Sequence, residues 1–213
     1  MSNQRHMVTQ FHASSLSGSD FAGVTVRDGR FEASALRGAN FSNAEIIGGK
    51  FKSSDLTEAN FDGANLTDAN FTTAELSGAS FRGTRLVRTD FSMSGLTNTQ
   101  FSDANLTDVV FRKTDLTRTV LDRCAFTGVD FSHSDLRGLT FDGVALTSVK
   151  FDEAALEGVS MRGAILRDCS FRASTKKYYK ALATVNFDGA RMDKLTYAGL
   201  KGFGVEPSNV TVE

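Results

Sequence analysis

Large apolar side chains occupy every fifth position of this chain from Phe11 to Phe171 without interruption. A period of five matches neither the roughly 3.6-residue repeat of an α-helix nor the two-residue repeat of a β-strand. Self-similarity over so long a stretch is typical of a solenoid, in which each unit buries its apolar face against its neighbours. The pattern therefore predicts one continuous repeat body over most of the chain.

Each five-residue unit also has a second, smaller inward position, two residues before the large side chain. Ala is the commonest residue there in the first half, while the other three positions are polar, charged or Gly. Each unit thus presents two side chains inward and three outward. This is what one side of a coil requires, with Gly easing some of the corners.

The type of large residue predicts how many units make one coil. Phe recurs at residues 11, 31, 51 and every twentieth residue up to 171, and Leu recurs likewise from 16 to 156. A four-sided coil of 20 residues would stack like on like, whereas a three-sided coil of 15 would stack Phe on Leu at every step. The sequence therefore favours an all-β fold, a four-sided parallel β-helix with about 20 residues per coil.

One coil exchanges the two residue types, since Leu121 stands in a Phe series and Phe126 in an aliphatic series. The exchange conserves total core volume, which packed interiors tolerate best. In the C-terminal half the smaller inward position also grows from Ala to residues such as Leu139 and Val144. We therefore expect a slightly wider interior in that half than in the Ala-lined first half.

The repeat resembles the pentapeptide-repeat family, whose motif is a small residue, Asp or Asn, Leu or Phe, and two polar positions. The clearest matches are ANFDGANLTDANF at residues 59–71, SALRGANF at 34–41 and DANLT at 103–107. The resemblance covers residues 11–174 and implies a right-handed quadrilateral β-helix. It also implies possible functions, because some relatives are similar in width and charge to duplex DNA, bind type II topoisomerases and confer quinolone resistance.

The period ends after Arg172, which divides the chain into three parts. We expect residues 1–10 to be an N-terminal cap or flexible lead and residues 11–174 to be the β-helix. Residues 175–213 would hold an insertion, a final partial coil and a C-terminal cap or dimerisation segment. A short helix or protruding loop is expected at 174–183, after which the repeat resumes, displaced by one residue, with Phe187, Met192 and Tyr197 as large residues.

The C-terminal segment has the apolar side chains that a solenoid end needs, because such an end exposes core and edge hydrogen-bonding groups. The resemblance adds a homodimer through this end, since the resistance relatives dimerise through their C-termini. We expect a cap and a dimer interface together. Their candidate residues are Leu200, Phe203, Val205, Val210 and Val212.

Composition excludes several functional classes. The formal net charge of −1 argues against direct nucleic-acid binding, for which a strongly basic domain is expected. Residues 1–10 lack the apolar core of a signal peptide, and no apolar run approaches the roughly 18 residues that span a membrane. We therefore expect a cytoplasmic protein with no membrane association, in which Cys124 and Cys169 are buried free thiols.

Motifs for catalysis and metal binding are not found in the sequence. The three His residues are isolated, and neither HExxH nor a paired Cys/His spacing occurs. No G-x-S-x-G elbow or phosphate-binding Gly loop is found. We therefore expect no enzymatic activity, no cofactor and no metal.

Charge placement is the remaining functional signal. No Lys or Arg lies between Lys52 and Arg82, and basic bands follow at residues 82–88 and 112–123. Five carboxylates within the gap form a candidate partner-binding surface, which we name the acidic collar: Asp55, Glu58, Asp62, Asp68 and Glu75.

Two hypotheses for function remain. The first is a non-enzymatic rod that binds another protein or serves as a structural scaffold, by its flat sides or its C-terminal end. The second, implied by the resemblance, is a DNA mimic that binds DNA gyrase or topoisomerase IV and gives quinolone resistance. Duplex DNA carries one charge per about 1.7 Å of its axis, and the basic bands would interrupt such a stripe. The sequence therefore favours the first hypothesis.

Overall fold

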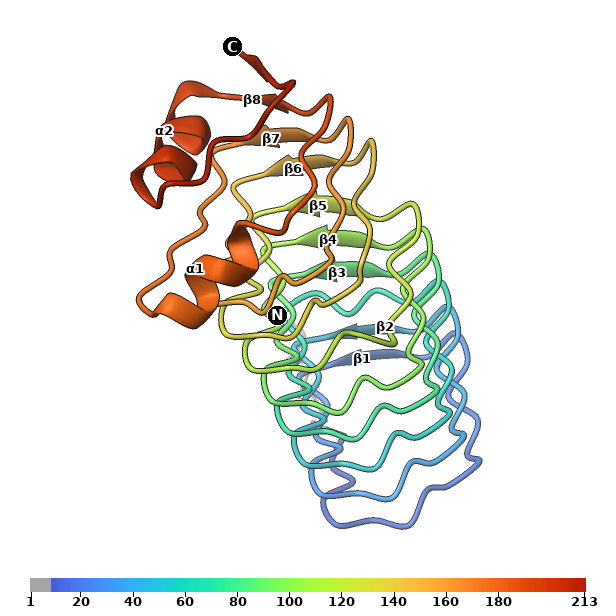
Figure 1. The fold of residues 1–213 in the computed structure, drawn as a ribbon. Helices are drawn as coiled ribbons and strands as arrows, with labels where there is room; N and C mark the ends of the chain where they lie inside the picture. Colours follow the sequence, from blue (N-terminus) through green and yellow to red (C-terminus); the bar gives the residue numbers. More distant parts are fainter. Residues whose placement is uncertain (1–8) are drawn as a thin grey trace, which may run out of the picture.

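The predicted four-sided parallel β-helix is confirmed in a computed structural model of the chain (Figure 1). The structure describes residues 9–213, so nearly all of the predicted N-terminal segment lies outside the described residues. The solenoid has about nine turns of about 20 residues. Parallel bridges join residues 20 apart, such as Gln10 to Arg30 and Asp55 to Glu75, so equivalent pentads of successive coils lie directly over one another.

Continuous strands form mainly on the side whose large residue is usually aliphatic, and Figure 1 shows them stacked along that side. The other sides are held by isolated parallel bridges. The strands form a two-stranded sheet and a seven-stranded sheet, with pairing in chain order. They are β1 (Thr25–Arg27), β2 (Glu45–Ile47), β3 (Arg85–Val87), β4 (Asn105–Thr107), β5 (Ala125–Thr127), β6 (Ala145–Thr147), β7 (Ile165–Arg167), β8 (Arg191–Met192) and β9 (Thr211–Val212).

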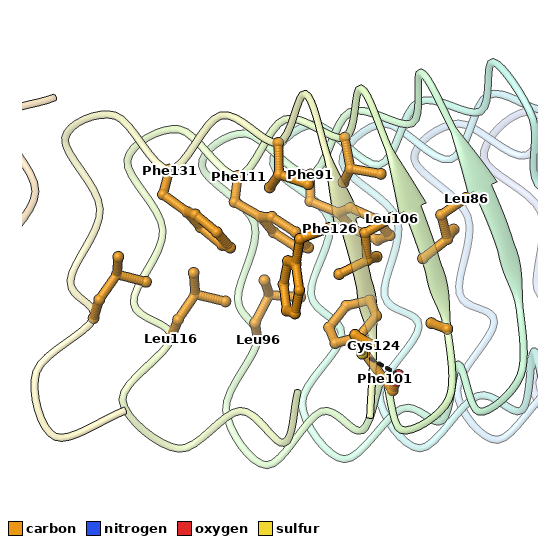
Figure 2. Packing of buried hydrophobic residues seen from close by; sticks show 14 of the residues in the cluster. Leu86, Phe91, Leu96, Phe101, Leu106, Phe111, Leu116, Cys124, Phe126 and Phe131 are labelled. Atoms are coloured by element: carbon orange, nitrogen blue, oxygen red, sulfur yellow. Dashed lines mark hydrogen bonds between the residues drawn. The ribbon is translucent and has the colours of Figure 1, made fainter. Parts of the chain in front are cut away.

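Two Phe ladders fill the core. Within a ladder the rings stack in parallel, with centroids 4.7 Å apart and planes 2° apart for Phe51 and Phe71. Between ladders they meet edge to face, as Phe61 and Phe71 do at 5.5 Å and 88°. Both are geometries that aromatic pairs prefer. Figure 2 shows Phe91, Phe111 and Phe131 in one row and Leu96 and Leu116 in another, as the sequence predicted.

The corners of the coil use a left-handed backbone at the second residue after each large side chain. The φ angles at these positions range from 51° at Ala13 to 74° at Gly138, and both Gly and non-Gly residues adopt this conformation. The turn therefore depends on the repeat as a whole more than on glycine. Within residues 13–168, Arg118 alone among these corner positions has no positive φ.

The coil wall is interrupted just after Arg118. Elsewhere on this side the coils are bridged through backbone hydrogen bonds, such as Phe101 N–H to the Val120 carbonyl at 2.8 Å. Among the described residues, none accepts a backbone hydrogen bond from the N–H of Leu121, Arg123 or Thr140. Leu121 is only partly buried. The exchange of Leu121 and Phe126 therefore coincides with a gap in the wall of the β-helix.

The last coil is modified by two helices, α1 (Lys176–Leu182) and α2 (Lys194–Gly202). Leu166 pairs with Met192, 26 residues further on, so a six-residue insertion accompanies α1. The repeat resumes at Phe187 and Met192 as predicted, and both side chains are buried. The predicted next pentad at Tyr197 is wrong, because that residue lies in α2, whose N-terminus is capped by the Asp193 carboxylate.

Candidate functional site

The acidic collar winds around the rod over about one coil and touches three of its sides. Asp55 and Glu75 occupy equivalent positions in successive coils and are joined by a parallel bridge. Asp62 lies next to Phe61 on the following side. Glu58 and Asp68 lie at left-handed corners, both with φ 60°. The structure thus brings two of the five carboxylates together and distributes the other three.

Two collar carboxylates are neutralised by arginine. Glu58 lies 3.4 Å from the Arg37 guanidinium, and Asp68 lies 2.7 Å from that of Arg88. The hydrogen bond from Arg88 lowers the pKa of Asp68. Exposed ion pairs contribute little to stability, because water screens them. They do remove net charge from the surface, so the collar is less acidic than its sequence indicates.

The other three collar carboxylates make no ion pair with a described residue. They hold the backbone instead. Asp55 accepts hydrogen bonds from the N–H of Thr57 at 3.0 Å and from its hydroxyl, and these lower the pKa of Asp55. Asp62 accepts from the N–H of Arg82 in the next coil at 3.0 Å. Glu75 accepts from the N–H of Ser77 at 2.9 Å.

Three of the seven basic side chains in the two bands pair with carboxylates. In the first band, Arg88 binds Asp68 of the collar. In the second, Arg112 lies 2.6 Å from Asp130, and Arg123 binds both carboxylate oxygens of Asp103 at 2.7 and 2.9 Å. The pattern is therefore one of short-range neutralisation between coils rather than of long acidic or basic stripes.

The C-terminal candidate residues divide between cap and surface. Leu200 and Val205 are buried, and Phe203 and Val210 pack partly buried against the core. These four side chains are covered largely by their own chain. The fifth candidate, Val212 in the edge strand β9, is 40% exposed. Leu195 in α2, which is not one of the candidates, is 77% exposed. A dimer through this end would therefore rest on Val212 and Leu195.

Residues outside these candidate sets form a surface groove of about 350 Å³ at the interrupted wall. It is lined by apolar and charged side chains: Thr119, Val120, Leu121, Asp122, Arg123, Leu139, Thr140, Asp142 and Val144. The sequence contained a signal for it, because the type exchange and the enlarged inward residues Leu139 and Val144 fall together. Taken separately, each of these two features indicates only core packing.

The buried cysteines are free, as predicted. The Cys124 thiol donates to the Phe101 carbonyl at 2.8 Å, and burial raises its pKa to about 12 (Figure 2). Within residues 9–213 no group of three or more His, Cys, Asp or Glu side chains could hold a metal ion. In the same part of the chain, no helix has the length and apolarity that a membrane crossing requires.

The coiled fold with its paired surface charges defines a repeat-protein scaffold. Family models confirm the resemblance: a pentapeptide repeat region matches residues 6–81 and 64–141, and pentapeptide repeats (8 copies) match residues 124–163 and 141–175. The chain belongs to the pentapeptide repeat family. No enzyme family is indicated, and no curated protein matches the chain in sequence.

Solved structures share the fold at low sequence identity. HetL, a pentapeptide repeat protein involved in heterocyst differentiation regulation from the cyanobacterium Nostoc, is 19% identical, with a TM-score of 0.51 over 96% of this chain and 87% of HetL. QnrB1, a plasmid-mediated fluoroquinolone resistance protein, is 14% identical in a trypsin-treated form, with a TM-score of 0.54 over 97% of this chain and 90% of that one. At these identities the likeness concerns the fold alone.

Proposed function

We propose that this chain is a non-enzymatic scaffold whose rigid sides bind a partner protein, with the acidic collar as the principal contact surface. The observation that carries the proposal is the state of Asp55, Asp62 and Glu75. Their carboxylates are held by hydrogen bonds and have no arginine partner among the described residues. A rigid, unpaired charge is a favourable recognition group, because little side-chain entropy is lost when a partner pairs with it.

A DNA mimic that binds DNA gyrase or topoisomerase IV is the second candidate, favoured by the collar and by the fold shared with QnrB1. The charge distribution supports it less well. Acidity is concentrated over about one coil, a rise of about 4.8 Å, while duplex DNA maintains a charge every ~1.7 Å along its axis. Arginines that are paired with carboxylates, such as Arg88 and Arg123, lie C-terminal to the collar.

The scaffold proposal is tested by removing collar charge without disturbing the turns. In the double variant Asp55→Asn and Asp62→Asn, the amide oxygens can still accept the same backbone hydrogen bonds. A matched control is Asp115→Asn with Asp152→Asn, since Asp115 accepts from Thr117 as Asp55 does from Thr57, and Asp152 accepts from the N–H of the next coil as Asp62 does.

Partners cross-linked to the wild-type chain in its own cells should be lost with the collar variant and kept with the control. Equal recovery of partners with the wild-type chain, the collar variant and the control variant would show that the collar is not the contact surface. Gyrase supercoiling, titrated with this protein with and without ciprofloxacin, separates the two functions. Neither inhibition nor protection at micromolar concentration would exclude the DNA mimic and leave the scaffold.

A further inference from the structure

The groove at residues 119–144 is an opening of one side of the β-helix between two successive coils. On the other three sides the same two coils stay in contact. Leu116 N–H donates to the Asp135 carbonyl at 2.9 Å, Phe131 N–H donates to the Lys150 carbonyl at 2.8 Å, and Phe126 pairs with Leu146. The opening is therefore a wedge, hinged on an otherwise intact solenoid.

Oversized inward side chains account for the wedge. Leu139 and Val144 occupy the smaller inward position that Ala fills in earlier coils, and both are only partly buried. Phe126 adds an aromatic ring beside them, in contact with Phe141 at 5.6 Å. Overfilling a packed core forces backbone shifts. Ring spacing is also wider in this part of the core, since Phe131 and Phe151 are 5.7 Å apart, against 4.7 Å for Phe51 and Phe71.

The two lips of the opening present unused backbone hydrogen-bonding groups. No described residue accepts from the N–H of Leu121 or Arg123 on one lip, or from the N–H of Thr140 on the other. The Thr140 and Asp142 carbonyls would accept the first two bonds if the wall were closed as it is at Phe101 and Asp103. Unpaired groups along a strand edge are a template for another extended chain.

The floor and rim of the groove define what that chain should contain. The floor is aliphatic, from Leu121, Leu139 and Val144. On the rim, Arg123 is already committed to Asp103 and Asp122. Asp142 makes no ion pair with a described residue and accepts from the N–H of Arg162 at 2.8 Å, so its charge is fixed in place. The groove therefore matches an aliphatic side chain flanked by a cationic one.

We propose that this groove binds an extended segment of a partner protein by β-strand addition, with an aliphatic residue facing inward and a neighbouring Lys or Arg facing Asp142. The inference rests on the proposed scaffold function and gives it a second, separate contact. A volume of about 350 Å³ admits a few residues of extended chain and no folded element.

The test uses the purified full chain and a phage-displayed library of random nine-residue peptides. Selected peptides should contain an aliphatic residue next to Lys or Arg, and their affinity is then measured by fluorescence polarisation. Leu139→Ala, which returns the inward position to the size found in earlier coils, should close the wall and weaken binding at least about tenfold, ~1.4 kcal/mol. Val159→Ala, at the equivalent buried position one coil later, is the control and should bind like wild type.

Asp142→Asn should weaken the same peptides, whereas Asp152→Asn should not. Asp152 likewise accepts from a Ser hydroxyl and a backbone N–H, but it lies on the opposite side of the coil and pairs with Arg172. Amide hydrogen exchange gives an independent measure of the opening. The N–H groups of Leu121, Arg123 and Thr140 should exchange fast in the free chain and slowly in Leu139→Ala or with bound peptide.

Three results would overturn the proposal. They are slow exchange of these amides in the free chain, peptide affinity that is unchanged by Leu139→Ala, and a concentration-dependent dimer in sedimentation that the groove variants dissociate, which would identify a second copy as the occupant. Because the peptides are selected on the purified chain, loss of this site leaves the effect of the collar variants unchanged, and the two proposals fail separately.

Discussion

The Phe ladders predict that the cost of removing a ring depends on its place along the solenoid. Phe71 is fully buried, with parallel rings above and below at 4.7 and 4.9 Å. The rings of Phe61 and Phe81 meet it edge-on at 5.5 and 5.7 Å. Phe11 in the first coil is only partly buried and has two ring neighbours, Phe21 and Phe31.

The magnitude follows from this difference. Replacing a fully buried Phe by Ala removes its transfer free energy and leaves a cavity, for a loss of about 3–5 kcal/mol. Each aromatic pair adds about 0.5–1.5 kcal/mol beyond burial, so Phe71→Ala should lie at or above the upper end. Phe11→Ala removes a partly buried ring from an end that has neighbours on one side only, and we expect about 1–2 kcal/mol.

Urea unfolding followed by far-ultraviolet circular dichroism measures both losses, and the chain has no Trp to offer a stronger fluorescence signal. The free energies are compared only if the dependence on urea concentration keeps the same slope in each variant. Equal losses for the central and the terminal ring, within about 0.5 kcal/mol, would refute the view that the ladder stabilises the rod through neighbour contacts on both sides.

Other perturbations test the cap, the thiols and the surface pairs. Asp193→Ala removes the α2 N-cap and should cost about 1 kcal/mol. Burial opposes the Asp193 carboxylate, but hydrogen bonds from Thr196 lower its pKa overall. The cap therefore stabilises fully above about pH 4 and loses its effect as pH falls further, so wild type and variant should melt closer together at pH 3 than at pH 7. The Cys124 and Cys169 thiols, whose pKa burial raises to about 12, should react with a thiol reagent at pH 8 only as the chain unfolds. Fast labelling of the native protein would contradict their burial. Arg88→Ala should leave stability nearly unchanged, with any loss smaller in high salt; a large loss that high salt does not reduce would show that the pair is not a screened surface contact.

The regular part of the fold could be predicted from sequence because each coil repeats the same packing problem. Identical rings 20 residues apart can stack only if four pentads complete a coil, and the Phe51 and Phe71 pair does so. The break after Arg172 was also visible, because the period itself stops there. The pentad at Tyr197 was not predicted correctly, because the Asp193 cap that starts α2 outweighs a five-residue pattern supported by only two earlier members.

The interrupted wall could not be predicted from residue types alone. Summed over the coil, Leu121 and Phe126 keep the total side-chain volume, so the residue types alone indicate an unchanged core. The structure responds to where the volume is placed: Leu139 and Val144 enlarge the same side that Leu121 leaves without a ring. Too much side-chain volume next to too little displaces the backbone, and no single one of these residues indicates this by itself.

The acidic side chains of the pentads have a structural role in the turns, and this role is separate from any role of their charge. In many pentads the residue before the large side chain accepts a hydrogen bond from the N–H two residues on, and Asn does this as well as Asp. Asn60 accepts from Asp62 at 2.9 Å and Asp55 from Thr57 at 3.0 Å. An amide oxygen therefore meets the needs of the turn, and the charge of Asp55 is not required for the fold. Exchange of Asp for Asn at such a position keeps the hydrogen bond of the turn and removes the charge, so it measures the effect of the charge alone.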